Sequence, residues 1–163
     1  MLNFDKPLIA AVQGVAIGGG TTLLTHCDFV YAGENAKFQL PFINLGLVPE
    51  FGSSWSLPAR SGYLRAAELI MLGQPFAARL AAEIGLVTKV VSDDRVLDTA
   101  IETASKLAAK PPAALQACKR LIKRYPRKQL DEAIKVENEE FASACALWRS
   151  KGSIHGIRGK ART

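Results

Sequence analysis

The sequence predicts an α/β fold in which strands alternate with helices and a helical part follows. Short apolar runs alternate with glycine turns in the N-terminal half, and helical periodicity takes over afterwards. The chain has 163 residues, 48% of them hydrophobic and 22% charged, which is enough for one buried core. We expect a core over residues 1–92, a helical region over 93–150 and a mobile basic tail over 151–163.

The expected strands are short apolar segments bounded by turn residues. They are "LIAAV" (8–12), "FVYA" (29–32), "KFQL" (37–40) and "LVTKVV" (86–91). Segment 41–62 is punctuated by proline and glycine and is expected to be loop with short helical pieces.

Glycine and proline residues mark where helices are expected to begin and end. Gly73 and Gly85 follow two helical segments and are typical C-terminal stop signals. Apolar residues at helical spacing over 96–108 predict a longer helix, which Pro111 and Pro112 end before another begins. The segment "KQLDEAIKVENEEFASACALW" (128–148) is expected to form one more helix.

The net charge of +6 owes much to "CKRLIKRYPRK" (118–128), which an acidic stretch follows. Such neighbouring stretches are usually solvated faces or mutual partners. A phosphate-bearing small molecule is another possible partner. The basic stretch has one aromatic residue, Tyr125, so nucleic-acid binding is not expected.

Several features predict a cytoplasmic protein. The longest apolar stretch is too short to span a membrane. Asp5 interrupts the basic region that a signal peptide would need, and glycines stand where a cleavage site would be. Three scattered cysteines are typical of reduced core thiols.

The motif "AIGGGTTLL" places Gly18, Gly19 and Gly20 between a strand and a helix. Without side chains, glycines let a ligand approach the backbone closely, and the free N–H groups there suit an anion. The motif is neither a GxGxxG fingerprint nor a P-loop, and a mere tight turn is the alternative.

Glu50, in "GLVPEFGSSW" (46–55), is an acid in otherwise apolar or small surroundings. If the fold buries it with its aromatic neighbours, desolvation would suit it for proton transfer. The alternative is an acid in the first turn of a helix that begins at Pro49.

Two other constellations have little support. His26, Cys27 and Asp28 are adjacent, but adjacent residues cannot easily converge on one ion, so no metal site is expected. "GSSWS" (52–56) does not match the nucleophile elbow of a serine hydrolase.

Taken together, residues 6–58, "KPLIAAVQGVAIGGGTTLLTHCDFVYAGENAKFQLPFINLGLVPEFGSSWSLP", resemble the enoyl-CoA hydratase/isomerase (crotonase) family. "ARLAAEIGLVTKVV" is similar to its downstream signature, and the matching extends to about Trp148. The resemblance implies a partial spiral of ββα turns. It also implies C-terminal helices that build a homotrimer or a dimer of trimers, and acyl-CoA thioester substrates.

The resemblance also implies site residues. Gly19 matches one N–H donor of the oxyanion hole that holds the thioester oxygen. Thr22 and Phe42 stand where the hydratases of the family carry two glutamates. Glu50 matches the single catalytic base of the Δ3,Δ2-enoyl-CoA isomerases, whose "LG..PEG.SS" pattern "LGLVPEFGSS" resembles. Phe42, Phe51 and Trp55 are expected either to line the acyl pocket or to belong to the core.

The resulting hypothesis is an enoyl-CoA isomerase that needs no cofactor, because coenzyme A is part of the substrate. Residues 1–5 stand where the family has a long N-terminal region with the other oxyanion donor. A truncated product, a partner that supplies the rest or a loss of activity would each account for this. The alternatives are an enoyl-CoA hydratase of fatty acid oxidation and a non-catalytic module that binds acyl-CoA or a protein.

Overall fold

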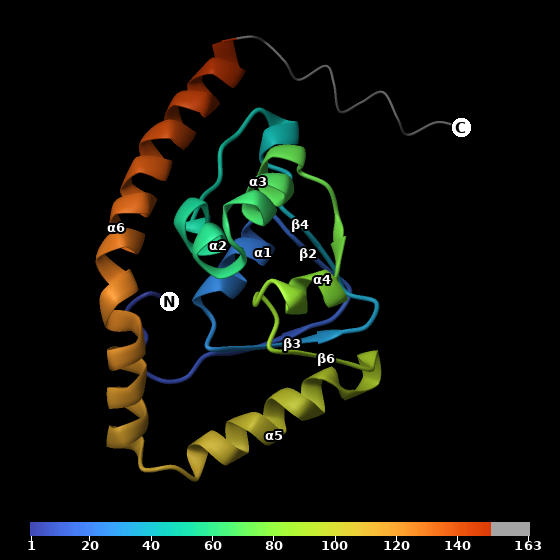
Figure 1. Ribbon diagram of the computed structural model, residues 1–163, viewed down its shortest axis with the longest axis vertical. Helices are drawn as coiled ribbons and strands as arrows, with labels where there is room; N and C mark the ends of the chain where they lie inside the picture. Colours follow the sequence, from blue (N-terminus) through green and yellow to red (C-terminus); the bar gives the residue numbers. More distant parts are fainter. Residues whose placement is uncertain (151–163) are drawn as a thin grey trace.

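A computed structural model describes the backbone of residues 1–150 and the side chains of residues 1–147. The predicted basic tail over 151–163 lies outside the described residues. The chain contributes strands to two three-stranded sheets (Figure 1). The first consists of β1 (Ile9–Val12), β3 (Phe29–Gly33) and β6 (Lys89–Val91), in the order β1-β3-β6 and all parallel. The second consists of β2 (Val15–Ile17), β4 (Lys37–Gln39) and β5 (Phe76–Ala77), with β2 parallel and β5 antiparallel to β4.

The chain advances by β–β–α turns, each with one strand in either sheet. β1 passes through Gly14 into β2 and then enters α1 (Gly19–Thr22) and the 3-10 helix η1 (Leu23–His26). β3 and β4 repeat the step before η2 (Ile43–Leu45), α2 (Ser53–Ser61) and α3 (Tyr63–Leu72). Gly14 has φ +73°, a left-handed conformation that favours glycine at the corner between the sheets. These two turns confirm the predicted partial ββα spiral.

The helical part differs from the prediction in one respect. α4 (Ala78–Glu83) and α5 (Val96–Ala108) coincide with predicted helices within two residues. The prediction of two helices after Pro112 is wrong, because α6 (Pro112–Ser150) is one continuous helix with Pro126 inside it. Proline removes one backbone hydrogen bond, but α6 is attached to the rest of the chain before Pro126 through Lys119 and after it through Glu137.

One apolar cluster joins both sheets to α2, α3 and α4. Phe38, Leu40 and Leu57 are among its largest fully buried members, and the Phe38 ring stacks on Phe76. A smaller cluster around Val96 attaches α5 to the first sheet, and α6 runs along one side of the molecule (Figure 1). Within the described residues, no helix combines the length and apolarity required to cross a membrane.

Candidate active site

Glu50 lies in an irregular loop between η2 and α2. α2 begins at Ser53, so the interpretation of Glu50 as a first-turn acid of a helix from Pro49 is wrong. The physical reason is the backbone between them: Phe51 has φ 60° and Gly52 φ 76°, left-handed conformations that a right-handed helix excludes. The Glu50 carbonyl oxygen accepts hydrogen bonds from the Ser53 N–H (3.1 Å) and hydroxyl (2.6 Å).

The carboxylate of Glu50 lies against the glycine motif. Its Oε1 accepts a hydrogen bond from the Thr22 hydroxyl at 2.5 Å, and a β-carbon placed on Gly19 would lie 3.8 Å from the same oxygen. Thr22 is wholly buried, whereas Glu50 is half-buried. The fold therefore brings together Glu50 and Gly19, the two residues expected to be catalytic.

The glycine motif keeps backbone donors available beside this carboxylate. The N–H of Gly18 donates to Gln39 O (2.9 Å), and Gly18 O accepts from the N–H groups of Thr21 and Thr22. The described residues supply no acceptor for the N–H of Gly19 or of Gly20. Uncommitted backbone N–H groups and the Glu50 carboxylate therefore lie close together at the glycine motif.

The three aromatic residues expected near the substrate lie in different surroundings. Phe42 is buried, and its ring lies close to Gly18, where an added β-carbon would be 3.9 Å from Phe42 Cε1. The half-buried Phe51 packs edge-on against His26. Trp55 faces a cavity of about 1130 Å³ whose lining includes neither Glu50 nor Gly19. Phe42 thus lies beside the glycine motif.

His26 has a structural task that the sequence did not reveal. It is 5% exposed, and its Nε2 lies 2.7 Å from the carbonyl oxygen of Phe51. A carbonyl can only accept, so Nε2 carries the hydrogen and donates it. Burial lowers the pKa of His26 below its usual value, the strongest of several influences on it. Within the described residues, no three side chains of metal-ligating type form a cluster around His26 or elsewhere.

Glu137 is a second residue whose structural role the sequence did not reveal. This glutamate of α6 is 5% exposed. Its Oε2 accepts from the N–H of Gly52 at 2.5 Å and its Oε1 from the N–H of Ser54 at 2.7 Å. The first N–H groups of a helix have no partner within the helix, and Glu137 supplies one for the start of α2. Its 85 residues of separation from Gly52 leave no local signal for this contact.

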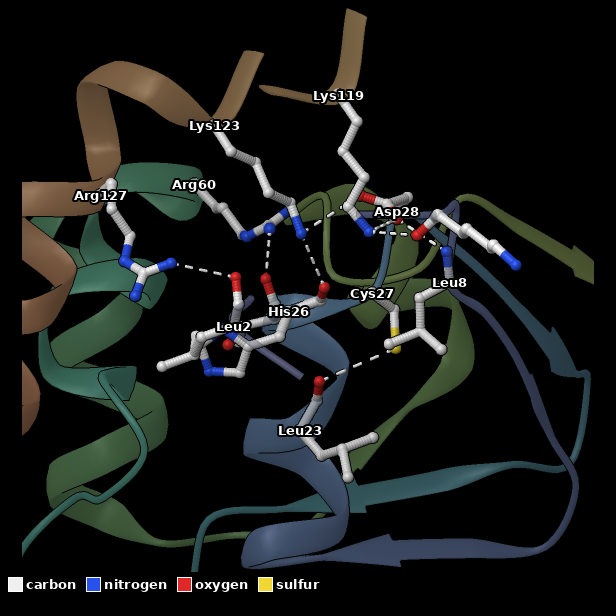
Figure 2. Close-up of polar contacts among 12 residues, drawn as sticks. Leu2, Leu8, Leu23, His26, Cys27, Asp28, Arg60, Lys119, Lys123 and Arg127 are labelled. Atoms are coloured by element: carbon white, nitrogen blue, oxygen red, sulfur yellow. Dashed lines mark hydrogen bonds and ion pairs between the residues drawn. The ribbon is translucent and has the colours of Figure 1, made fainter. Parts of the chain in front are cut away.

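The basic stretch of α6 binds the core (Figure 2). Lys119 and Lys123 form ion pairs with Asp28 at 2.6 and 3.2 Å, and Asp28 also accepts from the Leu8 N–H. Burial alone would raise the pKa of Asp28, but the Lys119 and Leu8 hydrogen bonds and Lys123 together hold it below its ordinary value. Arg127 donates to the carbonyl oxygen of Leu2 (Figure 2). These cations therefore join α6 to the spiral.

Comparison with known proteins places this geometry in context. Residues 1–160 match the family model for enoyl-CoA hydratase/isomerase. The chain is 39% identical over 143 residues to the 2,3-dehydroadipyl-CoA hydratase of Escherichia coli (strain K12), a match that covers 88% of this chain and 56% of that protein. It is 38% identical over 157 residues to enoyl-CoA delta isomerase 2 of Rattus norvegicus, covering 96% of this chain and 39% of that protein.

Solved structures agree with these matches. The crystal structure of an enoyl-CoA hydratase/isomerase from Pseudoalteromonas atlantica T6c superposes with a TM-score of 0.84 at 35% identity, over 91% of this chain and 64% of that one. The chain thus spans less than two thirds of the length of each of these three relatives.

Proposed function

Because the chain belongs to the enoyl-CoA hydratase/isomerase family, we propose that it acts as an isomerase that converts a 3-enoyl-CoA into a trans-2-enoyl-CoA. The observation that carries the proposal is the contact of the Glu50 carboxylate with Thr22 and the Gly19 backbone. Thr22 and Phe42 stand where the resemblance places the two glutamates of the hydratases. Glu50 is then the carboxylate available beside the oxyanion donor.

The isomerisation needs only one proton-transfer group. Glu50 takes a proton from C2 of the substrate, and the electrons of that C–H bond form a C1–C2 double bond while the thioester oxygen becomes an enolate. When a proton is added at C4, the C1–C2 electrons form the C2–C3 double bond of the product and the C3–C4 double bond is lost. The intervening enolate carries negative charge on the thioester oxygen, which the Gly19 N–H stabilises. Glu50 then returns the proton to C4, so no atom is gained or lost and no cofactor is required.

Hydration of a 2-enoyl-CoA is the second candidate, supported by the similarity to the Escherichia coli 2,3-dehydroadipyl-CoA hydratase. Addition of water calls for an acid and a base, and neither the Thr22 hydroxyl nor the Phe42 ring can act as a carboxylate would. A non-catalytic module that binds acyl-CoA is the third candidate. Homotrimers or dimers of trimers are the proposed assembly, which sedimentation of the purified protein would test.

Replacement of Glu50 by glutamine tests the proposal, because glutamine keeps the shape and hydrogen-bonding of the side chain but cannot take a proton. The rate of 3-enoyl-CoA isomerisation should fall by about 10²–10⁴-fold, the usual contribution of a positioned base. Glu34→Gln, at an exposed glutamate in a turn, is the matched control and should retain the rate of the original protein.

Three results would separate the candidates. Isomerisation that survives in Glu50→Gln contradicts the proposal. Faster hydration of a 2-enoyl-CoA than isomerisation by the unmodified protein favours the hydratase. Binding of an acyl-CoA in calorimetry with turnover of neither substrate favours the module.

A further inference from the structure

The peptide group between Phe51 and Gly52 is bonded at both of its polar atoms to side chains from distant parts of the chain. Its carbonyl oxygen, on Phe51, accepts from His26 Nε2 at 2.7 Å. Its N–H, on Gly52, donates to Glu137 Oε2 at 2.5 Å. The peptide is therefore held at one end by η1 and at the other by α6.

Both side chains are almost fully buried, at 5% exposure each. Water therefore cannot readily replace either of them, and an N–H group that donates to a carboxylate makes one of the stronger hydrogen bonds in proteins. Glu137 holds a second backbone group through its other oxygen, the N–H of Ser54. The direction of the Phe51–Gly52 peptide is therefore fixed by contacts from two almost fully buried side chains.

The loop needs such support because its backbone is unfavourable. Phe51 is the one residue other than glycine with positive φ in the described part of the chain. A left-handed conformation is unfavourable for such a residue and persists only where the surroundings impose it. Without the two bonds, this peptide group can turn over, and the backbone next to Glu50 changes direction with it.

We infer that His26 and Glu137 are positioning residues for Glu50. By fixing the Phe51–Gly52 peptide they keep the Glu50 carboxylate against Gly19 and the Thr22 hydroxyl. The inference rests on the proposed role of Glu50 as the base. It assigns to α6, which carries Glu137, a part in the geometry of the site.

Variants at both ends of the peptide test this inference. Glu137→Gln keeps the shape of the side chain, but its amide nitrogen is a donor and cannot accept a hydrogen bond from the backbone N–H that it would face. His26→Phe keeps a ring against Phe51 and removes the donor. Glu140→Gln makes the same charge change at an exposed position of α6 and is the matched control.

Two readouts are measured on each variant. The first is kcat and KM for 3-enoyl-CoA isomerisation. The second is hydrogen exchange of the Gly52 amide, at a temperature where circular dichroism shows each variant folded. In each single variant kcat should fall by about 10²-fold, as for small misplacements of reacting groups, with KM nearly unchanged. The double variant should lose less than the product of the two single losses, because both act on one peptide.

Exchange of the Gly52 amide should accelerate in His26→Phe, although that variant leaves the Glu137 carboxylate in place. Equal kcat in Glu137→Gln and Glu140→Gln, in a protein that does isomerise, overturns the inference while the proposed function stands. Absence of isomerisation by the unmodified protein overturns the proposed function. In that case the exchange decides: acceleration in His26→Phe supports the holding of the peptide at both ends, and unchanged exchange refutes it.

Discussion

Replacement of Thr22 by valine removes one hydroxyl from the candidate site with little change of shape. The Thr22 hydroxyl has one hydrogen, and its nearest acceptor is Glu50 Oε1 at 2.5 Å, with Gly19 O farther away at 3.3 Å. A hydrogen bond to a charged group contributes about 1.5–3 kcal/mol. Glu50 is half-buried, so water can restore part of this, and we expect a loss of about 1–2 kcal/mol of unfolding free energy. For a chain of this length the melting temperature should fall by about 2–8 °C.

Thermal denaturation at neutral pH checks this value, and a double-mutant cycle assigns it to the contact. In a Glu50→Ala background, Thr22→Val should cost about 1–2 kcal/mol less than in the original protein, because the partner is already gone. Thr22→Ser keeps the hydroxyl and should keep most of the coupling. A coupling energy below about 0.3 kcal/mol, the range in which independent sites add, would refute the hydrogen bond as a source of stability.

Two further predictions concern stability. Burial lowers the pKa of His26 below 6.5, so below pH 6.5 the unfolded chain binds more protons than the folded one and acidification should destabilise the fold. The pKa of Asp28 lies below 3.8, so this residue should keep its contribution to stability above pH 3.8 and lose it below. Thermal denaturation across these pH values checks both effects. A His26→Phe variant is the control, and it should lack the loss of stability that begins below pH 6.5. Gly52→Ala should cost about 2–4 kcal/mol in urea denaturation, because a β-carbon at this left-handed position would collide with Leu130. Gly14→Ala, equally left-handed but with no neighbour within 4 Å, should cost only about 1 kcal/mol, and equal losses in the two variants would contradict the packing argument.

The strands that the sequence revealed are those whose signal is local. "LIAAV" and "FVYA" are continuous apolar runs with turn residues after them, and β1 and β3 lie there within one residue. β5 has only two residues, too few for a periodic pattern, and it escaped prediction. β2 escaped as well, although β4 and β6 are no longer than its three residues and were predicted. Pro126 is a strong local signal for the end of a helix, but α6 continues through it. Contacts of α6 with the core on both sides of Pro126 stabilise the continuous helix.

The residues of the candidate site also differ in whether the sequence could reveal their role. Glu50 and Gly19 could be paired through the family resemblance, because their residue types carry the chemistry. His26 and Glu137 bind backbone groups, and any residue type could have supplied the carbonyl, and any except proline the N–H, that they bind. Only the folded chain, which closes separations of 25 and 85 residues, brings these partners together.

The start of α2 explains why Glu50 can face the glycine motif at all. The free N–H groups at the beginning of a helix attract a carboxylate, and Glu50, three residues before Ser53, is the nearest one in sequence. That place is taken by Glu137, whose two oxygens bind Gly52 and Ser54. Since a second carboxylate at the same N–H groups would meet repulsion from the first, the Glu50 side chain is directed to the Thr22 hydroxyl instead. The acid expected at the helix start and the acid proposed for proton transfer are thus two different residues, one from α6 and one from the loop.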